Sequence, residues 1–151
     1  MQGSGSDAMV ICTSHADGKN MSFHHLRIAR PVTDLQKSSD IYCRGLGLKE
    51  IGAFSDHDGF SGRMLGRDDL PWHLEFTLCA EHPIAPAASA EDLLVLYIPQ
   101  QDAWLVACGT MESAGFTRTH AFNPYWDRKG VTFQDHDGYR VVLQNSEWGA
   151  T

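Results

Sequence analysis

Two short segments of the sequence contain the residues whose types and spacing suit chemistry. The segment HHLRIAR contains His25 and Arg27, and the segment WHLEFTL contains His73 and Glu75. Because polar and apolar residues alternate in both, each is predicted to be a strand that carries its two polar residues on one face. Imidazole and carboxylate groups bind divalent cations and transfer protons, whereas a guanidinium binds carboxylate or phosphate. Spacing within single strands does not show that the pairs converge, and two ordinary histidines at the rim of a sheet are the better interpretation.

Glu75 lies in the middle of its strand, between residues that define an apolar face. That face consists of Leu74, Phe76 and Leu78, so Glu75 points away from the apolar layer. A carboxylate on a strand is commonly solvated, but one that faces a cavity needs a partner, because burying an unpaired charge is costly. A further, weaker hypothesis is a metal-free enzyme in which Glu75 is the catalytic group and acts as a general base, with Arg27 beside it.

The strands that carry these residues belong to a repeated order of elements. A strand at His24–Arg30 is followed by a helix over residues 33–44, with Thr33 and Gln36 as a capping box at its start. The helix is predicted to end near Gly45, a residue that tolerates the left-handed conformation. Three further strands complete the first half: Leu48–Phe54, Gly62–Gly66 and Trp72–Leu78.

The second half repeats this order. Its predicted elements are a strand at Leu93–Ile98, a helix at Gln101–Ser113, and strands at Phe116–Phe122, Val131–Gln134 and Tyr139–Gln144. Two Asp-His-Asp-Gly segments, at 56–59 and 135–138, are interpreted as turns. The pattern predicts an α+β fold of two βαβββ modules, mostly antiparallel, with both helices on the same outer face.

One domain accounts for most of the chain, since 151 residues suit a single hydrophobic core. Within residues 21–151 we assign 21–81 to module one, 82–91 to a linker rich in Pro and Ala, and 92–146 to module two. Residues 1–20 are interpreted as a disordered tail or an expression remnant. They contain no basic segment followed by a long apolar stretch, so no signal peptide is predicted.

Composition excludes several classes of partner. The formal net charge is −7, with 12 basic and 19 acidic residues, which argues against binding to nucleic acid or an anionic membrane. No apolar run approaches the roughly 18 residues of a membrane span. The four cysteines form no CxxC pair and are irregularly spaced, which favours a reduced, cytoplasmic protein over a thiolate zinc site.

Three strings resemble a known superfamily. These are LRIARPVTDLQKSSDIYCRGLGL, PWHLEFT and TFQDHDGYRVVLQ, and the likeness extends over roughly residues 21 to 146. They resemble the glyoxalase/bleomycin-resistance/dioxygenase, or vicinal oxygen chelate, superfamily, and the segment NPYW is similar to an uncharacterised bacterial glyoxalase-like branch of it. The resemblance implies that the two modules curl a sheet around a cavity and that the protein is a homodimer.

The resemblance also assigns four positions to metal ligands, usually His and Glu, on the first and last strand of each module. In this sequence they fall at Arg27, Glu75, Leu93 and Val142. Only Glu75 has a donor atom, because guanidinium cannot ligate a cation and the other two side chains are apolar. We therefore expect no metal and no other cofactor, and we predict that Arg27 and Glu75 form a salt bridge across the cavity.

Two functions compete on these observations. The first is a small-molecule-binding protein of the drug-sequestering type, for an anionic or aromatic ligand held by Arg27, His25 and His73. Further ligand-binding candidates are Tyr97, Trp126 and Arg140. The alternative is a lyase, isomerase or dioxygenase that holds a divalent metal at a shifted site made of His25, His73 and Glu75.

Overall fold

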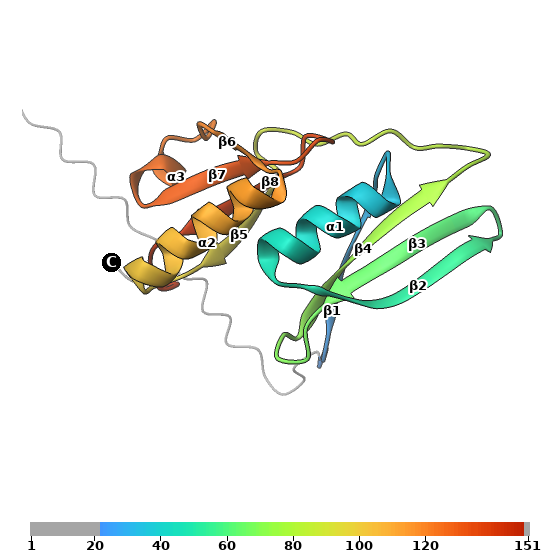
Figure 1. The fold of residues 1–151 in the computed structure, drawn as a ribbon, viewed down its shortest axis with the longest axis horizontal. Helices are drawn as coiled ribbons and strands as arrows, with labels where there is room; N and C mark the ends of the chain where they lie inside the picture. The colour runs from blue at the N-terminus through green and yellow to red at the C-terminus, as the bar shows by residue number, and fades with distance from the viewer. Residues whose placement is uncertain (1–21, 150–151) are drawn as a thin grey trace, which may run out of the picture.

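The computed structural model describes residues 22–149 (Figure 1), which form two βαβββ modules of the α+β class, as predicted. The elements of module one are β1 (Leu26–Pro31), α1 (Leu35–Leu46), β2 (Lys49–His57), β3 (Phe60–Gly66) and β4 (Trp72–Cys79). Those of module two are β5 (Leu93–Tyr97), α2 (Gln101–Ala114), β6 (Thr117–Thr119), α3 (Tyr125–Arg128), β7 (Gly130–Gln134) and β8 (Arg140–Gln144). The predicted tail, residues 1–20, lies outside the described residues.

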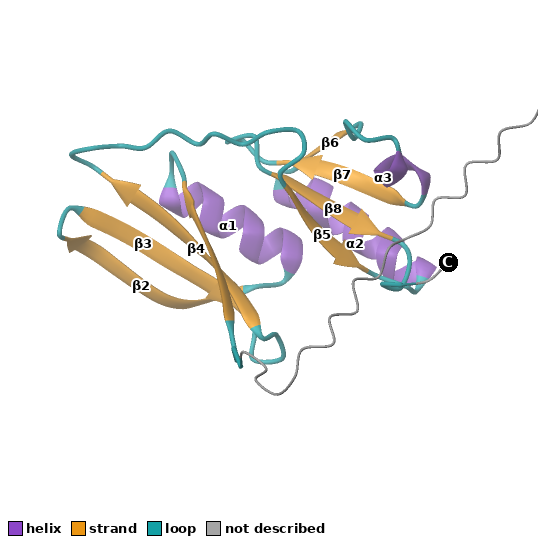
Figure 2. Cartoon of the chain, turned by 180° about the vertical axis from the view of Figure 1, so that it is seen from behind, coloured by secondary structure: helices purple, strands orange, loops and turns teal. Residues whose placement is uncertain are grey.

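The strands form two separate sheets rather than the single curved sheet that was expected. Sheet one has the order β1-β4-β3-β2 and sheet two the order β5-β8-β7-β6. In each sheet the first and last strands of the module pair in parallel, and the other neighbours are antiparallel. Both helices cover the same side of the molecule, and the sheets lie in front of them in the opposite view (Figure 2), which confirms the predicted position of the helices.

The start of α1 differs from the predicted capping box. Asp34 is the N-cap, and its carboxylate accepts a hydrogen bond from the backbone N–H of Lys37 at 3.0 Å. Thr33 instead donates its hydroxyl to Asp137 of module two, and Gln36 donates to Asp40 within the helix. An Asp is as good an N-cap as a Thr, and the partner of Thr33 is 104 residues away, which local pattern cannot reveal.

The end of α1 also differs from the prediction, by two residues. Gly47, with φ of +66°, is the left-handed C-cap, whereas Gly45 lies inside the helix. A Cβ on Gly45 would lie 2.9 Å from Cε2 of Phe116 and 3.0 Å from Sδ of Met111. The glycine therefore permits the close approach of α1 to module two.

One hydrophobic core extends through both modules, because α1 and α2 pack against each other. Its fully enclosed centre includes Tyr42, whose ring meets the rings of Phe76 and Phe116 edge-on, at centroid distances of 4.9 and 5.0 Å. The remaining buried members of the core are Val32, Ile41, Leu48, Leu65, Leu74, Cys108, Met111, Ala114, Phe133, Val141 and Leu143.

The predicted strand at Phe116–Phe122 is wrong over most of its length. Only Thr117–Thr119 pairs with β7, and the chain then turns into the short helix α3. Two side chains fix that turn: Asn123 accepts a hydrogen bond from the backbone N–H of Tyr125 at 3.0 Å, and Asp127 accepts one from Ala121 at 3.1 Å. These local bonds compete with the sheet for the same backbone.

Candidate functional site

The register of β1 and β4 brings the four chemically useful residues together. Arg27 is opposite His73 and Ala29 is opposite Glu75 in this parallel pair. On β4 the alternate residues Leu74 and Phe76 are completely buried in the core beneath α1. His73 and Glu75 therefore lie on the other face of sheet one, with His25 and Arg27 beside them.

Arg27 is the centre of this cluster, which we call the Arg27 cluster (His25, Arg27, His73 and Glu75). Its Nη1 lies 3.2 Å from Oε2 of Glu75, so the predicted ion pair is confirmed. Its Nε donates a hydrogen bond of 2.8 Å to Nε2 of His73, whose Nδ1 is hydrogen-bonded to Nε2 of His25. The two histidines, for which the sequence showed no convergence, contact each other, since their ring centroids are 4.5 Å apart.

These contacts determine the protonation of His73. To accept the N–H of Arg27, its Nε2 must carry no proton, so the proton of the neutral ring lies on Nδ1 and is donated to His25. Burial lowers the pKa of His73, and the charges of Arg27 and His25 lower it further, against the smaller opposing effect of Glu75. The imidazole of His73 is therefore neutral at pH 7.

The ion pair is not enclosed as predicted. The side chain of Arg27 is 49% exposed and that of Glu75 14% exposed. The strands form two separate sheets that do not close around a cavity, and Arg27 lies on β1, which is an edge strand of sheet one. The pair consequently has the character of a partly exposed salt bridge, for which screening by water reduces the interaction.

The strand register of module two agrees with the predicted equivalence of Leu93 to Arg27 and of Val142 to Glu75. Val95 is opposite Val142, as Ala29 is opposite Glu75, and Leu93 precedes Val95 by two residues as Arg27 precedes Ala29. Val142 is completely buried. Leu93 and Val142, the equivalents of Arg27 and Glu75 in module two, have apolar side chains with no atom that could bind a metal ion.

The residues at the four assigned positions do not fit a divalent metal. Glu75 is the sole ligand type among them, and it already binds the guanidinium of Arg27. Within residues 22–149, no group of three or more His, Cys, Asp or Glu side chains is placed to hold a metal ion. This includes His25, His73 and Glu75, which share a face without converging on one point.

The other three ligand-binding candidates lie on module two. Tyr97 packs against Trp148 with ring centroids 6.1 Å apart, and Trp126 packs against Tyr125 at 4.9 Å. Arg140 donates a hydrogen bond of 3.1 Å to Oε1 of Gln134. In the described part of the chain none of the three has a hydrogen bond, ion pair or ring contact with the Arg27 cluster, so the six candidates fall into two groups.

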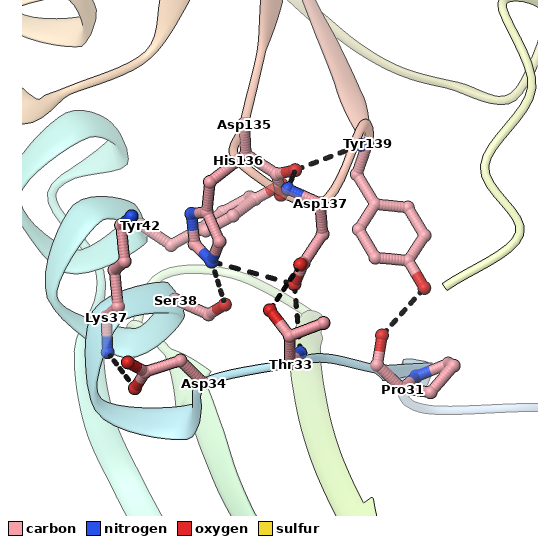
Figure 3. Close-up of polar contacts among 10 residues, drawn as sticks. All are labelled: Pro31, Thr33, Asp34, Lys37, Ser38, Tyr42, Asp135, His136, Asp137 and Tyr139. Atoms are coloured by element: carbon pink, nitrogen blue, oxygen red, sulfur yellow. Dashed lines mark hydrogen bonds and ion pairs between the residues drawn. The ribbon is translucent and has the colours of Figure 1, made fainter. Parts of the chain in front are cut away.

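The sequence did not reveal a polar network between the modules (Figure 3). The turn that follows β7 supplies Asp135, which accepts the hydroxyl of Tyr42 at 2.8 Å, and Asp137, which accepts the backbone N–H of Thr33 at 3.2 Å. Tyr139 donates its hydroxyl to the carbonyl of Pro31 at 2.8 Å. The sequence offered one signal of this network. One carboxylate is enough to shape the turn, so the presence of a second, Asp137, indicated a partner outside the turn.

Fold and site together define a class of protein. The topology of paired βαβββ modules is that of the glyoxalase/bleomycin-resistance, or vicinal oxygen chelate, superfamily. Within it, the chain belongs to the YycE-like family: residues 26–77 match the YycE-like N-terminal domain and residues 91–145 the YycE-like C-terminal domain. The uncharacterised protein YycE of Bacillus subtilis (strain 168) is 38% identical over 122 residues, which is 81% of this chain and 88% of the relative.

Solved structures agree with this assignment. The crystal structure of the Bacillus subtilis YycE protein, described as a protein of unknown function and a candidate glyoxalase or fosfomycin resistance protein, has a TM-score of 0.76 at 38% identity, over 82% of this chain and 90% of that one. The trypanothione-dependent glyoxalase I of Leishmania major scores 0.63 at 19% identity over 83% and 88%. An antibiotic-binding protein from Streptomyces sp. CB03234 scores 0.58 at 20% identity over 83% and 98%. The last two likenesses concern the fold alone.

A membrane helix is absent from the described residues. Over 22–149, every helix is too short or too polar to cross a bilayer.

Proposed function

We propose that this protein binds a small molecule, without a metal ion, at the face of sheet one that carries the Arg27 cluster. The observation that carries the proposal is the ion pair of Arg27 and Glu75, at 3.2 Å. A dication at this point would be repelled by the fixed charge of Arg27 and would compete with it for Glu75. Metal-free binding is therefore the function that suits these side chains best.

An anionic, flat ligand suits the cluster. Arg27 donates its Nε–H to His73 and forms an ion pair with Glu75 through Nη1, and a guanidinium has five N–H groups. Its half-exposed side chain leaves N–H groups for a carboxylate or phosphonate, beside the imidazole rings of His25 and His73. The antibiotic-binding neighbour shows that the fold is compatible with ligand binding, although the fold alone does not decide function.

The metal-dependent alternative has one observation in its favour. His25, His73 and Glu75 lie on the same face, and His25 contacts His73. Both nitrogens of His73 are however engaged, Nε2 by Arg27 and Nδ1 by His25. Metal binding would have to break at least one of these bonds, which makes the alternative the weaker of the two.

Amide NMR titration tests the proposal. Benzoate and phenylphosphonate serve as probes of an aromatic carboxylate and an aromatic phosphonate, first with EDTA present and then, without EDTA, with added zinc or nickel. We expect saturable shifts in β1 and β4 that weaken in Arg27→Met and persist in Arg118→Met, which breaks an ion pair on module two whose arginine is about as exposed as Arg27. The proposal fails if neither probe shifts these strands, or if binding needs added zinc or nickel and disappears in His73→Ala.

A homodimer is part of the same proposal. Two surfaces of the molecule expose large apolar side chains: Ile84 of the linker is 68% exposed, and Phe122 and Tyr125 beside Trp126 are 71% and 52% exposed. Such residues are enriched in contacts between proteins. Light scattering at high micromolar concentration should give the mass of a dimer, and a monomer at every concentration would contradict this.

A further inference from the structure

We infer a second ligand site, for a small oxyanion, in the pocket between α3 and the end of β8. The pocket has a volume of about 190 Å³ and is lined by Tyr125, Arg128, Lys129, Gln144 and Ser146. Its residues come from the module that lacks the Arg27 cluster, so the site is separate from the one proposed above. An oxyanion here means a phosphate, sulfate or carboxylate group.

The side chains of the lining have one property in common, which is that each can donate a hydrogen bond. Two of them, Arg128 and Lys129, are cations, and no acidic residue lines the pocket. Neither cation forms an ion pair with any residue among 22–149. In a chain of net charge −7, a pocket with two unpaired cations and no acid favours a negative ligand.

Gln144 provides the second, independent observation. Its side chain is only 3% exposed, and its Oε1 has no hydrogen-bond partner. A buried amide oxygen without a partner is unfavourable, and a bound water or ion is one of the explanations for such an atom in a native protein. The amide can turn either its oxygen or its nitrogen towards the pocket. Its oxygen would accept a hydrogen bond from a protonated oxygen of the anion, and its N–H would donate one to an unprotonated oxygen.

The walls of the pocket are held in place by the backbone. Asn145 donates its N–H to the carbonyl of Lys129 at 2.7 Å, which ties the end of β8 to the segment after α3. Gly130, directly opposite Gln144, has no Cβ, and an added one would lie 2.5 Å from Oε1 of Gln144. The glycine therefore leaves room for the amide, and the pocket exists before any ligand binds.

The test is a titration of isotope-labelled protein with sodium phosphate, sodium sulfate and sodium acetate, each at constant ionic strength kept with sodium chloride. Saturable amide shifts confined to residues 125–130 and 144–146 are expected for at least one of the three. Binding of phosphate and sulfate alone would identify a tetrahedral oxyanion, and binding of acetate would include carboxylates. The absence of saturable shifts with all three would overturn the inference.

Variants separate a built site from a diffuse surface charge. Arg128→Gln and Lys129→Gln should each weaken binding by about fivefold, as expected for a partly exposed charge. Lys49→Gln, which removes an equal charge at the start of β2, should leave the affinity unchanged. Gln144→Leu keeps the volume of the side chain and should also weaken binding. If Lys49→Gln weakened binding as much as the pocket variants do, the effect would be one of diffuse surface charge. If Gln144→Leu left the affinity unchanged, the pocket would not be the site.

Discussion

The hydroxyl of Tyr42 donates a hydrogen bond of 2.8 Å to the carboxylate of Asp135, across 93 residues of sequence and from one module to the other. Both side chains are buried, with exposures of 0% and 6%. Burial raises the pKa of Tyr42, and the charge and hydrogen bond of Asp135 raise it further. The phenol therefore stays protonated and remains a donor over the whole range in which the protein is studied.

Tyr42→Phe should lower the free energy of unfolding by about 1.5–3 kcal/mol, because it removes a buried hydrogen bond to a charged group. Urea denaturation followed by circular dichroism measures this. Tyr97→Phe is the control, since Tyr97 is 37% exposed and forms no hydrogen bond through its hydroxyl within the described chain. Equal stability losses in the two variants would contradict the role given to Asp135.

Two glycines in helices should respond oppositely to the same substitution. Gly45→Ala places a methyl group 2.9 Å from the buried ring of Phe116, and overpacking of this kind costs about 1–3 kcal/mol. Gly109→Ala in α2 meets nothing within 4 Å and should add up to about 1 kcal/mol through helix propensity. Thermal unfolding compares them. A stabilised Gly45→Ala would mean that α1 can move away from module two.

The ion pair of Arg27 and Glu75 should couple only weakly in a double-mutant cycle with Arg27→Met and Glu75→Gln. Because half of the Arg27 side chain is exposed, we expect a coupling free energy below about 1 kcal/mol. A fully buried pair would lose about 3–5 kcal/mol on removal of one partner. A coupling in that higher range would show that this face is covered in solution.

The pKa of His73, followed by NMR of its ring, should rise in Arg27→Met towards its ordinary value of 6.5. The variant removes both the adjacent positive charge and the hydrogen bond that holds Nε2 unprotonated. In the wild type the folded state binds a proton on His73 less readily than the unfolded state. Stability should therefore fall as the pH falls below about 6.5. An unchanged pKa in Arg27→Met would contradict the contact.

The sequence predicted most of the fold because β1 and β4 alternate polar and apolar residues and because glycine or proline marks the ends of several elements. The second helix was predicted at Gln101–Ser113, and it ends at Ala114 with Gly115 as its left-handed C-cap, at φ of +116°. The failures occur where a partner distant in sequence decides the structure. Thr33 turns from its predicted cap towards Asp137, and Gly45 serves packing against Phe116 instead of ending α1.

The candidate site was predictable in part. The opposite charges of Arg27 and Glu75 on matching strands predicted their ion pair, and the register confirms the equivalence of Glu75 and Val142. The contact between His25 and His73 was not predictable, because it depends on the exact register of two parallel strands. Nothing local to Gln144 or Lys129 indicated that the two line one pocket, since the pairing of β7 with β8 brings them together.

Elemental analysis of the purified protein, expressed and purified without chelators, tests the central claim most directly. With a guanidinium at one assigned position and apolar side chains at two others, the site offers one carboxylate, and a metal site needs about three protein ligands. We predict well under one equivalent of zinc, nickel, iron or manganese. One full equivalent of any of them, lost in His73→Ala, would contradict the account and support a metal-dependent enzyme.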